Sequence, residues 1–500
     1  MKKILINQEP WQTRVAIIEE GKLQNVYFWA HAGNLLERCF LKGKITKVLP
    51  GIQTAFVEIG EEKSGFLHIS EIDRELAINK MNGFFDSTES TKKDHPKRQL
   101  PDISKILKEN EDILVQVTKE PVNQKGAKLT TCYTLPGRFI VLMPNIPRIG
   151  TSKKIEKPEE RARLKEIVFN SLPEGMGAII RTCSEERTEN EIKQDVNFLL
   201  ETWNEIQAGL AKAVSPARIY QEISLPFQVI RDHLDDDIEV VIVDDAAQQQ
   251  ELARYVKKIA PEHSTKIRQY AGTTPLFDFY KVEEQIAASL EHKVELKSGG
   301  SIVIEATEAM TVVDVNTGRF TGKSNLEDTI FKTNIEAAQE VVRQLKVRNI
   351  GGLIVIDFID MSMSSNRQKL FSFFEKTLKE QDRFQSVVLR ISEFGLVQMT
   401  RKRSGKTLSQ QLTVNCHTCH GTGHTPSVQA QSYRVLQDIK RELDSDKTGK
   451  TITLKLNPQV FEYISNTEYD TLLNFEKLYD CKIVLESEKN LTIASFRIEK

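Results

Sequence analysis

The most regular pattern in the chain runs from residue 297 to residue 412 and restricts the fold more than any other feature. Residues 301–318 alternate between apolar and polar side chains, which predicts a β-hairpin. Residues 324–349 then place apolar side chains at helical spacing. GGLIVIDFIDM, residues 351–361, is a near-continuous apolar run and predicts a strand that is covered on both faces. The predicted order in this segment is therefore strand, strand, helix, strand.

Two acidic side chains, Asp314 and Asp357, come at the ends of the two strands that this helix joins. A buried carboxylate is costly unless it is paired or binds a metal ion. A single acid would suit a structural role, such as a turn capped by Asp360 or shaped by Asn316. Two acids on strands joined by a helix favour a magnesium site, because magnesium takes few protein oxygen ligands and keeps several waters. Magnesium held there polarises a phosphodiester and activates water.

Length and composition set the broad class. The 500 residues exceed the size of a single hydrophobic core, so about three or more domains are expected. The chain is 39% hydrophobic and 28% charged, which is typical of a soluble globular protein. Its N-terminus lacks the apolar segment of a signal peptide, and no apolar run reaches the length of a membrane span, so we expect a cytoplasmic protein.

The net charge of −1 excludes nucleic-acid binding by bulk positive charge, although local basic patches stay possible. The candidates are TKKDHPKR, residues 91–98, and RKRSGK, residues 401–406.

CHTCHGTGH, residues 416–424, contains half of a zinc site. The 6 cysteines of the chain are scattered except for Cys416 and Cys419, which suits a reducing compartment. A structural zinc ion needs four ligands, and this pair supplies two thiolates. Three interpretations stay open: a site shared between chains, an intrachain site that adds His424 and His420, or a surface pair without metal.

Residues 38–72 combine β-rich runs with glycine and proline punctuation, which predicts a small barrel. Alternation along AFVEIG and GFLHIS points the aliphatic side chains inward and Phe56, Phe66 and His68 outward. Either a neighbouring domain covers these rings, or they form a stacking platform for single-stranded nucleic acid.

The string GKITKVLPGIQTAFVEIGEEKSGFLHISEI, residues 43–72, resembles the OB domain of the ribosomal protein S1 type, which binds RNA. The resemblance implies RNA contacts at Phe56, Phe66 and His68.

Five motifs in order and spacing resemble the ribonuclease E and ribonuclease G family, with a length that fits the ribonuclease G type. They are DVNTGRF, NLEDTIFKTNIEAAQE, GGLIVIDFIDM, FGLVQMTRKR and CHTCHGTG. This family cuts single-stranded RNA endonucleolytically. The resemblance implies that Asp314 and Asp357 hold magnesium, with Asn316 as a third catalytic residue, in a DNase I-like catalytic domain.

The same resemblance implies further RNA contacts. GMGAIIRT matches the family's sensor for a 5′ monophosphate, so Arg181 and Thr182 are expected to bind that phosphate. Lys119 and Lys125 fall where relatives place RNA-contacting lysines. The sequence departs from the family pattern at Cys183, where relatives commonly have alanine.

Two further expectations come from the family. Cys416 and Cys419 of two chains are expected to share one zinc ion across a homodimer, and assembly of that dimer into a homotetramer stays open. Gln398 is a second departure, because glutamate is usual at that position.

The fold class that follows is multidomain α+β, with an OB-fold barrel inserted in an RNase H-like domain. The expected boundaries are residues 1–35 with 226–289 for the RNase H-like domain, 36–130 for the OB domain, 131–225 for the 5′ sensor, 290–412 for the catalytic domain, 413–425 for the zinc link and 426–500 for a small α+β domain.

The predicted function is a magnesium-dependent endoribonuclease that is stimulated by a 5′ monophosphate and acts in rRNA processing, mRNA decay or both. It would lack the long disordered tail of many ribonuclease E proteins. The contrasting hypothesis is a non-catalytic RNA-binding regulator that keeps the barrel and the dimer. A phosphorolytic exonuclease with a similar barrel is a third possibility.

Overall fold

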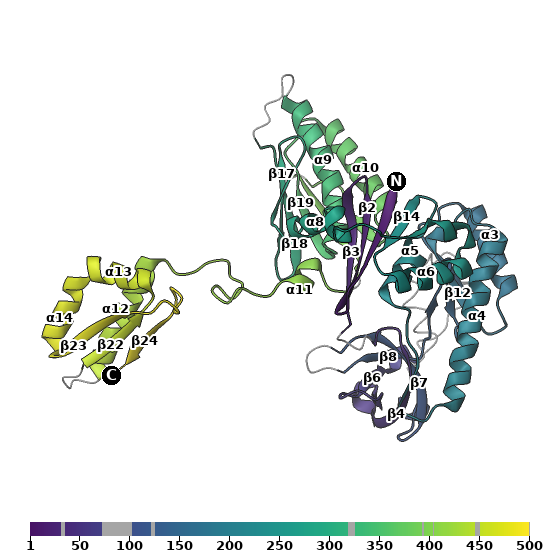
Figure 1. Ribbon diagram of the computed structural model, residues 1–500, viewed down its shortest axis with the longest axis horizontal. Helices are drawn as coiled ribbons and strands as arrows, with labels where there is room; N and C mark the ends of the chain where they lie inside the picture. Colours follow the sequence, from purple (N-terminus) through teal and green to yellow (C-terminus); the bar gives the residue numbers. More distant parts are fainter. Residues whose placement is uncertain are drawn as a thin grey trace. The chain divides into compact units, whose positions relative to one another are not determined.

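The computed structural model describes residues 1–31, 36–72, 103–121, 126–318, 326–392, 395–403, 405–445 and 451–499, without the side chains of residues 105 and 326. The predicted basic patch at residues 91–98 and the candidate Lys125 lie outside these residues. The chain forms two compact units, Met1–Ser404 and Gly405–Lys500 (Figure 1). Strands and helices mix in both, as an α+β fold requires. None of the helices in the described part of the chain has the length and apolar composition that crossing a membrane requires.

The first sheet has five strands in the order β15-β14-β1-β2-β3. Its elements are β1 (Lys2–Gln8), β2 (Gln12–Glu19), β3 (Lys22–Ala30), α5 (Leu225–His233), β14 (Ile238–Val243), α6 (Ala246–Ile259), η4 (Pro261–Lys266), β15 (Ile267–Gln269), α7 (Leu276–Phe279) and α8 (Val282–Ala288). Because β1 pairs in parallel with β14, the N-terminal strands and a segment more than 200 residues later form one sheet. Its classification as RNase H-like and the domain boundaries stay predictions.

The second sheet has six strands in the order β13-β4-β5-β6-β8-β7 and closes into a barrel, because β4 also pairs with β7. Its elements are β4 (Phe40–Leu49), η1 (Pro50–Ile52), β5 (Thr54–Glu58), β6 (Gly65–His68), η2 (Ile69–Glu71), α2 (Ile103–Ile106), β7 (Asp112–Lys119), β8 (Lys128–Thr130) and β13 (Ala217–Tyr220). Ala55, Val57 and Leu67 are buried inside the barrel, whereas Phe56, Phe66 and His68 are half-buried, as the alternation predicted.

The third sheet has four strands in the order β11-β12-β10-β9. Its elements are β9 (Leu135–Pro136), β10 (Ile140–Met143), β11 (Ile149–Thr151), α3 (Pro158–Ser171), β12 (Gly177–Ile180), η3 (Thr182–Ser184) and α4 (Glu189–Lys212). Both long helices bury apolar side chains in a shared core with β10 and β12, which leaves Arg181 and Thr182 at the end of β12.

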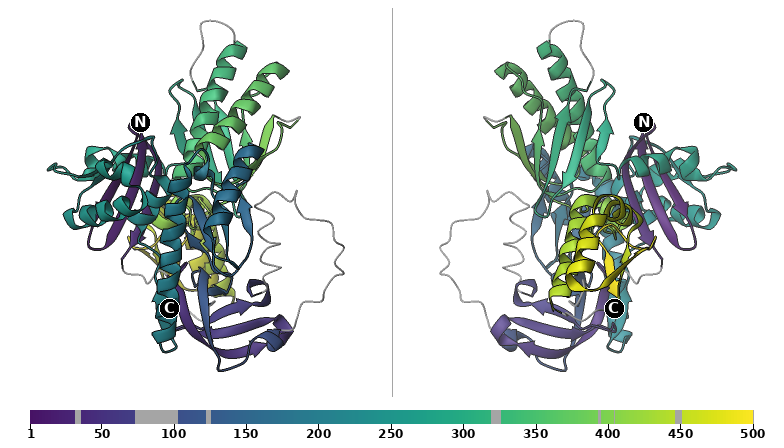
Figure 2. Two further views of the ribbon diagram at one scale, coloured as in Figure 1. Left: turned by 90° about the vertical axis from the view of Figure 1, so that its right-hand side faces the viewer. Right: turned by 90° about the vertical axis from the view of Figure 1, so that its left-hand side faces the viewer.

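The fourth sheet has six strands in the order β16-β17-β18-β19-β21-β20. Its elements are β16 (Lys293–Glu295), β17 (Ser301–Ala306), β18 (Met310–Asn316), α9 (Leu326–Val347), β19 (Gly352–Asp357), α10 (Ser364–Gln381), β20 (Ser386–Val388) and β21 (Leu396–Arg401). The predicted hairpin, helix and strand are confirmed. Helices α9 and α10 share one hydrophobic core with one face of the sheet (Figures 1 and 2).

The prediction that β19 is covered on both faces is wrong. Only Ile354 and Ile356 of this strand are buried, while Leu353 on the other face is 41% exposed. The apolar run of residues 351–361 gave a wrong prediction because both helices that cover the described part of the sheet lie on the same side of it. The opposite face of this sheet, called the open face below, therefore carries the side chains that alternate with the core residues.

Arg401 at the end of β21 corrects a second expectation, because the first cation of the run RKRSGK is not on the surface. Its guanidinium donates to both carboxylate oxygens of Asp382, over 2.5 and 3.0 Å, and also to the carbonyl of Ile350 over 2.5 Å. The side chains of Arg401 and Asp382 are 1% and 2% exposed. Burial of a cation is tolerated here because the carboxylate pairs with it in a bidentate arrangement.

The second unit holds a three-stranded sheet in the order β23-β22-β24. Its elements are α11 (Leu408–Leu412), α12 (Val428–Ser445), β22 (Thr451–Leu456), α13 (Pro458–Thr467), α14 (Tyr469–Tyr479), β23 (Lys482–Ser487) and β24 (Phe496–Glu499). Strand β22 is parallel to β23 and antiparallel to β24. Its core joins α12 and α13 to β22.

We expect Arg401→Met to lower the free energy of unfolding by about 3 to 5 kcal/mol, because it leaves the Asp382 carboxylate buried without its cation. The double variant Arg401→Met, Asp382→Asn should recover part of this loss, since it removes the unpaired charge. Urea unfolding followed by circular dichroism measures both. Equal stability of the wild type and the single variant would contradict the importance of this ion pair.

Candidate active site

Asp314 and Asp357 face one another across the open face. They are direct partners in the parallel pairing of β18 with β19, and both side chains are exposed. Neighbouring strands lie about 4.8 Å apart, so the two carboxylates project side by side. The amide of Asn316 donates to Asp314 over 2.8 Å. The sequence prediction that these three residues come together is borne out by this geometry, whereas their catalytic role stays a prediction.

The electrostatics of this pair suit a cation. Partial burial raises the pKa of Asp357 above its ordinary value, and the nearby carboxylates of Asp314 and Asp360 raise it further. Like charges held this close disfavour full ionisation unless a positive charge lies between them. Two carboxylates with room for water are a donor set that magnesium accepts. Among the described residues, no cluster of three or more histidine, cysteine or acidic side chains is placed to hold a metal ion.

Asn334 on α9 fixes the chain next to these acids. Its buried amide donates to the carbonyl of Ile359 over 2.8 Å and accepts from the N–H of the same residue over 3.0 Å. Asn334 is 0% exposed. Nearby, the carboxylate of Glu327 accepts from the backbone N–H groups of Ser362 and Met363, over 3.1 Å each, just before α10. Helix α9 thus holds the segment between Asp357 and α10 by side chain to backbone hydrogen bonds.

Sequence reasoning missed Asn334, although a signal was present. Ile330, Asn334 and Ala338 are spaced by four residues on α9, so a polar residue interrupts an apolar stripe. A buried amide needs partners for its donor and its acceptor, and here one backbone residue supplies both.

Gln398 also lies on the open face. Leu396 pairs with Asp357 across β19 and β21, and Gln398 follows two residues later with an exposed side chain. The side chain of Gln398 therefore projects from the same face as the two acids. That glutamine in place of the family's usual glutamate alters a metal site here stays a prediction.

A row of aromatic and basic side chains crosses the barrel. Phe56 and Phe66 are direct partners on β5 and β6. Phe56 also pairs with Lys47 on β4, and Phe66 pairs with Lys128 on β8. Lys119 is exposed and pairs with Lys128. Directly paired residues point to the same side of a sheet, so two rings lie between cations.

Lys47 and Lys128 were not among the residues predicted from the sequence. They become candidates only through strand pairing. His68 flanks the row, and its Nδ1 atom lies 2.8 Å from the Ser70 hydroxyl.

Arg181 is held in place from two sides. It donates to the carbonyl of Gly137 over 2.6 Å and to the carboxylate of Asp232 over 2.7 Å. Although burial alone would raise the pKa of Asp232, Arg181 and Arg231 hold it well below its usual range. Thr182 is exposed, and its hydroxyl lies 2.8 Å from that of Ser152. Arg181, Thr182 and Ser152 therefore surround the end of β12.

Asp195 fixes the backbone segment next to Arg181. Its carboxylate accepts from the consecutive backbone N–H groups of Arg138, Phe139 and Ile140, over 2.8 to 3.0 Å. Cys183 donates its thiol to the carbonyl of Arg138 over 2.9 Å, and burial raises the pKa of that thiol. The cysteine is thus engaged with the supporting loop.

Cys416 and Cys419 lie in the second unit. The backbone N–H groups of Cys419 and Thr418, followed by the Cys419 thiol, lower the pKa of Cys416 to about 7. A thiol of this kind readily becomes the thiolate that zinc binds. The choice between a site shared between chains and the intrachain alternative with His424 stays a prediction.

Comparison with known proteins agrees with this geometry. The sequence model of the Ribonuclease E/G family matches residues 134–404. The chain belongs to the ribonuclease E/G family. An S1 RNA binding domain matches residues 40–131, and an RNase E/G thioredoxin-like domain matches residues 415–500. The prediction of an OB-type barrel is thereby confirmed, and the small C-terminal domain gains a thioredoxin-like classification.

Several relatives are similar over nearly the whole chain. Ribonuclease G of Haemophilus influenzae is 39% identical over 472 residues, which cover 94% of this chain and 93% of that protein. Ribonuclease G of Escherichia coli K12 is 38% identical over 95% of this chain and 94% of its own length. Ribonuclease E of the same strain is 34% identical over 97% of this chain but 45% of its own length. The prediction of an endoribonuclease of this family that acts on RNA is confirmed.

We expect Asn334→Ala to lower the free energy of unfolding by about 1 to 3 kcal/mol, because it leaves both backbone groups of Ile359 without a partner. The magnesium concentration for half-maximal RNA cleavage should rise roughly tenfold, since the segment after Asp357 loses its support. Gln339→Ala, on the exposed side of α9, is the matched control. An unchanged magnesium requirement in fully folded Asn334→Ala protein would show that the amide is structural only.

Proposed function

We propose that this protein cuts single-stranded RNA internally by magnesium-dependent hydrolysis and that a 5′ monophosphate on the RNA stimulates it. The direct pairing of Asp314 with Asp357 on the open face is the observation that carries the proposal. We further propose that it acts in the cytoplasm on ribosomal RNA precursors, messenger RNA or both. Family membership and the S1 domain support RNA as the substrate.

Asp314 and Asp357 would hold the magnesium ion, and the Asn316 amide restrains the Asp314 carboxylate by donating to it over 2.8 Å. Bound magnesium supplies a Lewis acid for the phosphodiester and lowers the pKa of a water molecule. The pKa of Asp357 is raised first by partial burial and then by the carboxylates of Asp314 and Asp360, and a bound cation would relieve this second contribution. Asn334 contributes indirectly, since it keeps the segment after Asp357 in place.

The barrel would bind the strand that is to be cut. Stacking of bases on Phe56 and Phe66 tolerates many sequences, because each base has a π face. His68 would contact the same strand, and Lys47 and Lys119 lie where they can neutralise phosphates along it. Lys128 is paired with the carboxylate of Glu71 over 2.5 Å, so it contributes less charge to this row. A strand held in this way presents an internal phosphodiester to the acids.

Arg181 and Thr182 would bind the 5′ phosphate. Arg181 uses one terminal nitrogen for both Gly137 and Asp232, so the rest of its fork is available to phosphate oxygens. The Asp232 carboxylate fixes the guanidinium but also opposes an anion. The Arg181 cation attracts the doubly charged terminal phosphate more strongly than an internal phosphate, which carries one charge, so the sensor is expected to favour the terminal phosphate despite Asp232.

Cys416 and Cys419 would bind zinc together with the same pair of a second chain. The lowered pKa of Cys416 and the exposure of its side chain support a half-site that is completed from outside this chain. Four thiolates then fill the tetrahedral shell, and the metal links a homodimer. Further assembly into a tetramer is compatible with this link.

A cleavage assay tests the nuclease and the sensor together. One RNA is prepared with a 5′ monophosphate or a 5′ triphosphate, and its products are resolved by length in the presence of magnesium. We expect internal fragments that form faster from the monophosphate. Asp357→Asn should slow both reactions by more than about a hundredfold, because even outer partners of a metal are worth about 10- to 100-fold.

The controls separate the two parts. Glu308→Gln, in the turn before β18, removes an exposed acid at the far end of that strand and should cut normally. Arg181→Lys keeps the charge but not the fork, so it should lose the preference for the monophosphate while still cutting the triphosphate. Intact RNA that wild-type protein nevertheless binds would favour the non-catalytic alternative.

The zinc proposal is tested by metal content and mass. We expect one zinc ion for every two chains and a dimer that falls apart when a strong chelator removes the metal. Cys416→Ser with Cys419→Ser should lose both properties, whereas Cys481→Ser, in the same unit but outside the pair, should keep them. One zinc ion per chain in a monomer would contradict the shared site.

A further inference from the structure

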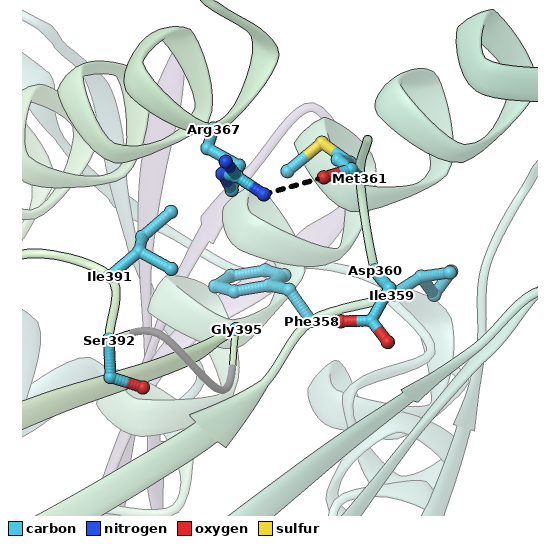
Figure 3. A pocket seen from close by; sticks show the side chains of 8 residues that line it. All are labelled: Phe358, Ile359, Asp360, Met361, Arg367, Ile391, Ser392 and Gly395. Carbon is cyan, nitrogen blue, oxygen red and sulfur yellow. Dashed lines mark hydrogen bonds between the residues drawn. The ribbon is translucent and has the colours of Figure 1, made fainter. Parts of the chain in front are cut away.

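A hollow of about 420 Å³ lies directly beyond the strand that carries Asp357. Its lining includes Phe358, Asp360, Met361, Arg367, Ile391 and Ser392. Figure 3 shows the Phe358 ring in the middle of the lining, with Arg367 above it, Ser392 at the lower left and Asp360 at the right. The cavity therefore combines an aromatic wall with a cation, an anion and a hydroxyl group.

The hollow lies next to the proposed metal site. Asp360 follows Asp357 by three residues, and its charge contributes to the raised pKa of Asp357. Gly395 lies close to Asp360, because a Cβ atom on this residue would lie 2.9 Å from the Asp360 Oδ1 atom, and its φ of +77° also favours glycine. An RNA strand with its scissile phosphate at Asp314 and Asp357 would thus bring a neighbouring nucleotide to this cavity.

The polar groups at the walls are partly free to meet a ligand. Arg367, near the start of α10, donates from one terminal nitrogen to the carbonyl of Met361 over 2.9 Å (Figure 3). Both Arg367 and Asp360 are exposed, whereas Phe358 is 4% exposed and forms a fixed apolar surface. The hydrogen bond to Met361 orients the guanidinium and leaves the rest of its fork for an acceptor pair.

We infer that this hollow is a subsite for one base of the RNA close to the scissile phosphate and that it favours guanine. The inference rests on the proposed nuclease function and adds a sequence preference to it. A guanidinium fork matches the adjacent O6 and N7 acceptors of guanine. A carboxylate matches its adjacent N1–H and N2–H donors. No other standard base offers a pair of adjacent acceptors together with a pair of adjacent donors.

The size of the cavity agrees with this ligand. Small-molecule sites in proteins have volumes from about 300 Å³ upward, and they combine apolar walls with a few polar groups. The apolar side chains of Phe358, Met361 and Ile391 supply the walls here. One base with part of its ribose fits, whereas a folded RNA element does not.

The experiment maps cleavage positions in a pool of RNAs. The pool consists of single-stranded RNAs with a 5′ monophosphate and a randomised window, cut under single-turnover conditions with magnesium, and both new ends are sequenced. Wild-type protein should enrich guanine at one position within a few nucleotides of the cut. Arg367→Met should reduce that enrichment about tenfold, with the loss of rate confined to sites that carry the guanine.

Two further variants sharpen the result. Lys369→Met removes an exposed cation from the same helix that does not line the hollow, so it should keep the guanine enrichment. Arg367→Lys keeps the charge without the fork, so it should fall between the wild type and Arg367→Met. Circular dichroism shows whether each variant is folded.

The outcomes separate the inference from the function on which it rests. If wild-type protein does not cut the pool, the proposed nuclease fails. If it cuts, but Arg367→Met keeps the same enrichment or slows all sequences equally, the base subsite is overturned while the nuclease stands. Enrichment of another base that depends on Arg367 would overturn the assignment to guanine.

Discussion

Repulsion between two carboxylates is the constraint on which the rest of the site depends. The parallel pairing of β18 with β19 forces Asp314 and Asp357 side by side, and this arrangement costs free energy without a cation. The core beneath the sheet compensates, because Ile354 and Ile356 on one strand and Val313 and Val315 on the other are buried against the two helices. If the pairing of β18 with β19 shifted by one residue, the acids would turn toward the core. The buried apolar side chains therefore fix the strand register, and this register places the two acids side by side.

Buried polar groups then fix the loops that the sheet alone would leave loose. The Asn334 amide holds the backbone of Ile359 beside the acids, and Asp195 holds three backbone N–H groups below Arg181. Lys154 joins these two regions, because it donates to the carbonyls of Asp382 and Arg383 over 2.7 and 3.3 Å. The carboxylate of Asp382 is itself paired with Arg401. The hydrogen bonds of Lys154 thereby connect the domain with the proposed phosphate sensor to the sheet that carries Asp314 and Asp357.

The sequence predicted features that depend on neighbouring residues, but it did not predict those that depend on contacts between residues far apart in the chain. Alternation and helical spacing are local, so the inward Ala55 and Val57, the hairpin before Asp314 and the helix from Leu326 to Val347 were predicted correctly. Arg401 was misjudged because its burial depends on Asp382, which is 19 residues away. Asn334 was missed for the same reason, since its partner Ile359 lies 25 residues away. The role of Arg181 and the sharing of zinc between two chains came from family resemblance, because the local pattern around Arg181 also fits a surface residue and the spacing of Cys416 and Cys419 indicates only half of a zinc site.

The open face explains why an acid pair here suits cutting within a chain. A sheet with one uncovered face presents Asp314 and Asp357 on a surface that is open along the strands, and both side chains are exposed. A polymer can lie across such a surface with nucleotides on both sides of the reacting bond, so no free end has to reach the acids. The end of the RNA is then free to be read elsewhere, at Arg181, and a neighbouring base can be read at Arg367. The proposed recognition of the end, the base and the scissile bond by separate groups requires the acids to be exposed, and the uncovered face of the sheet permits it.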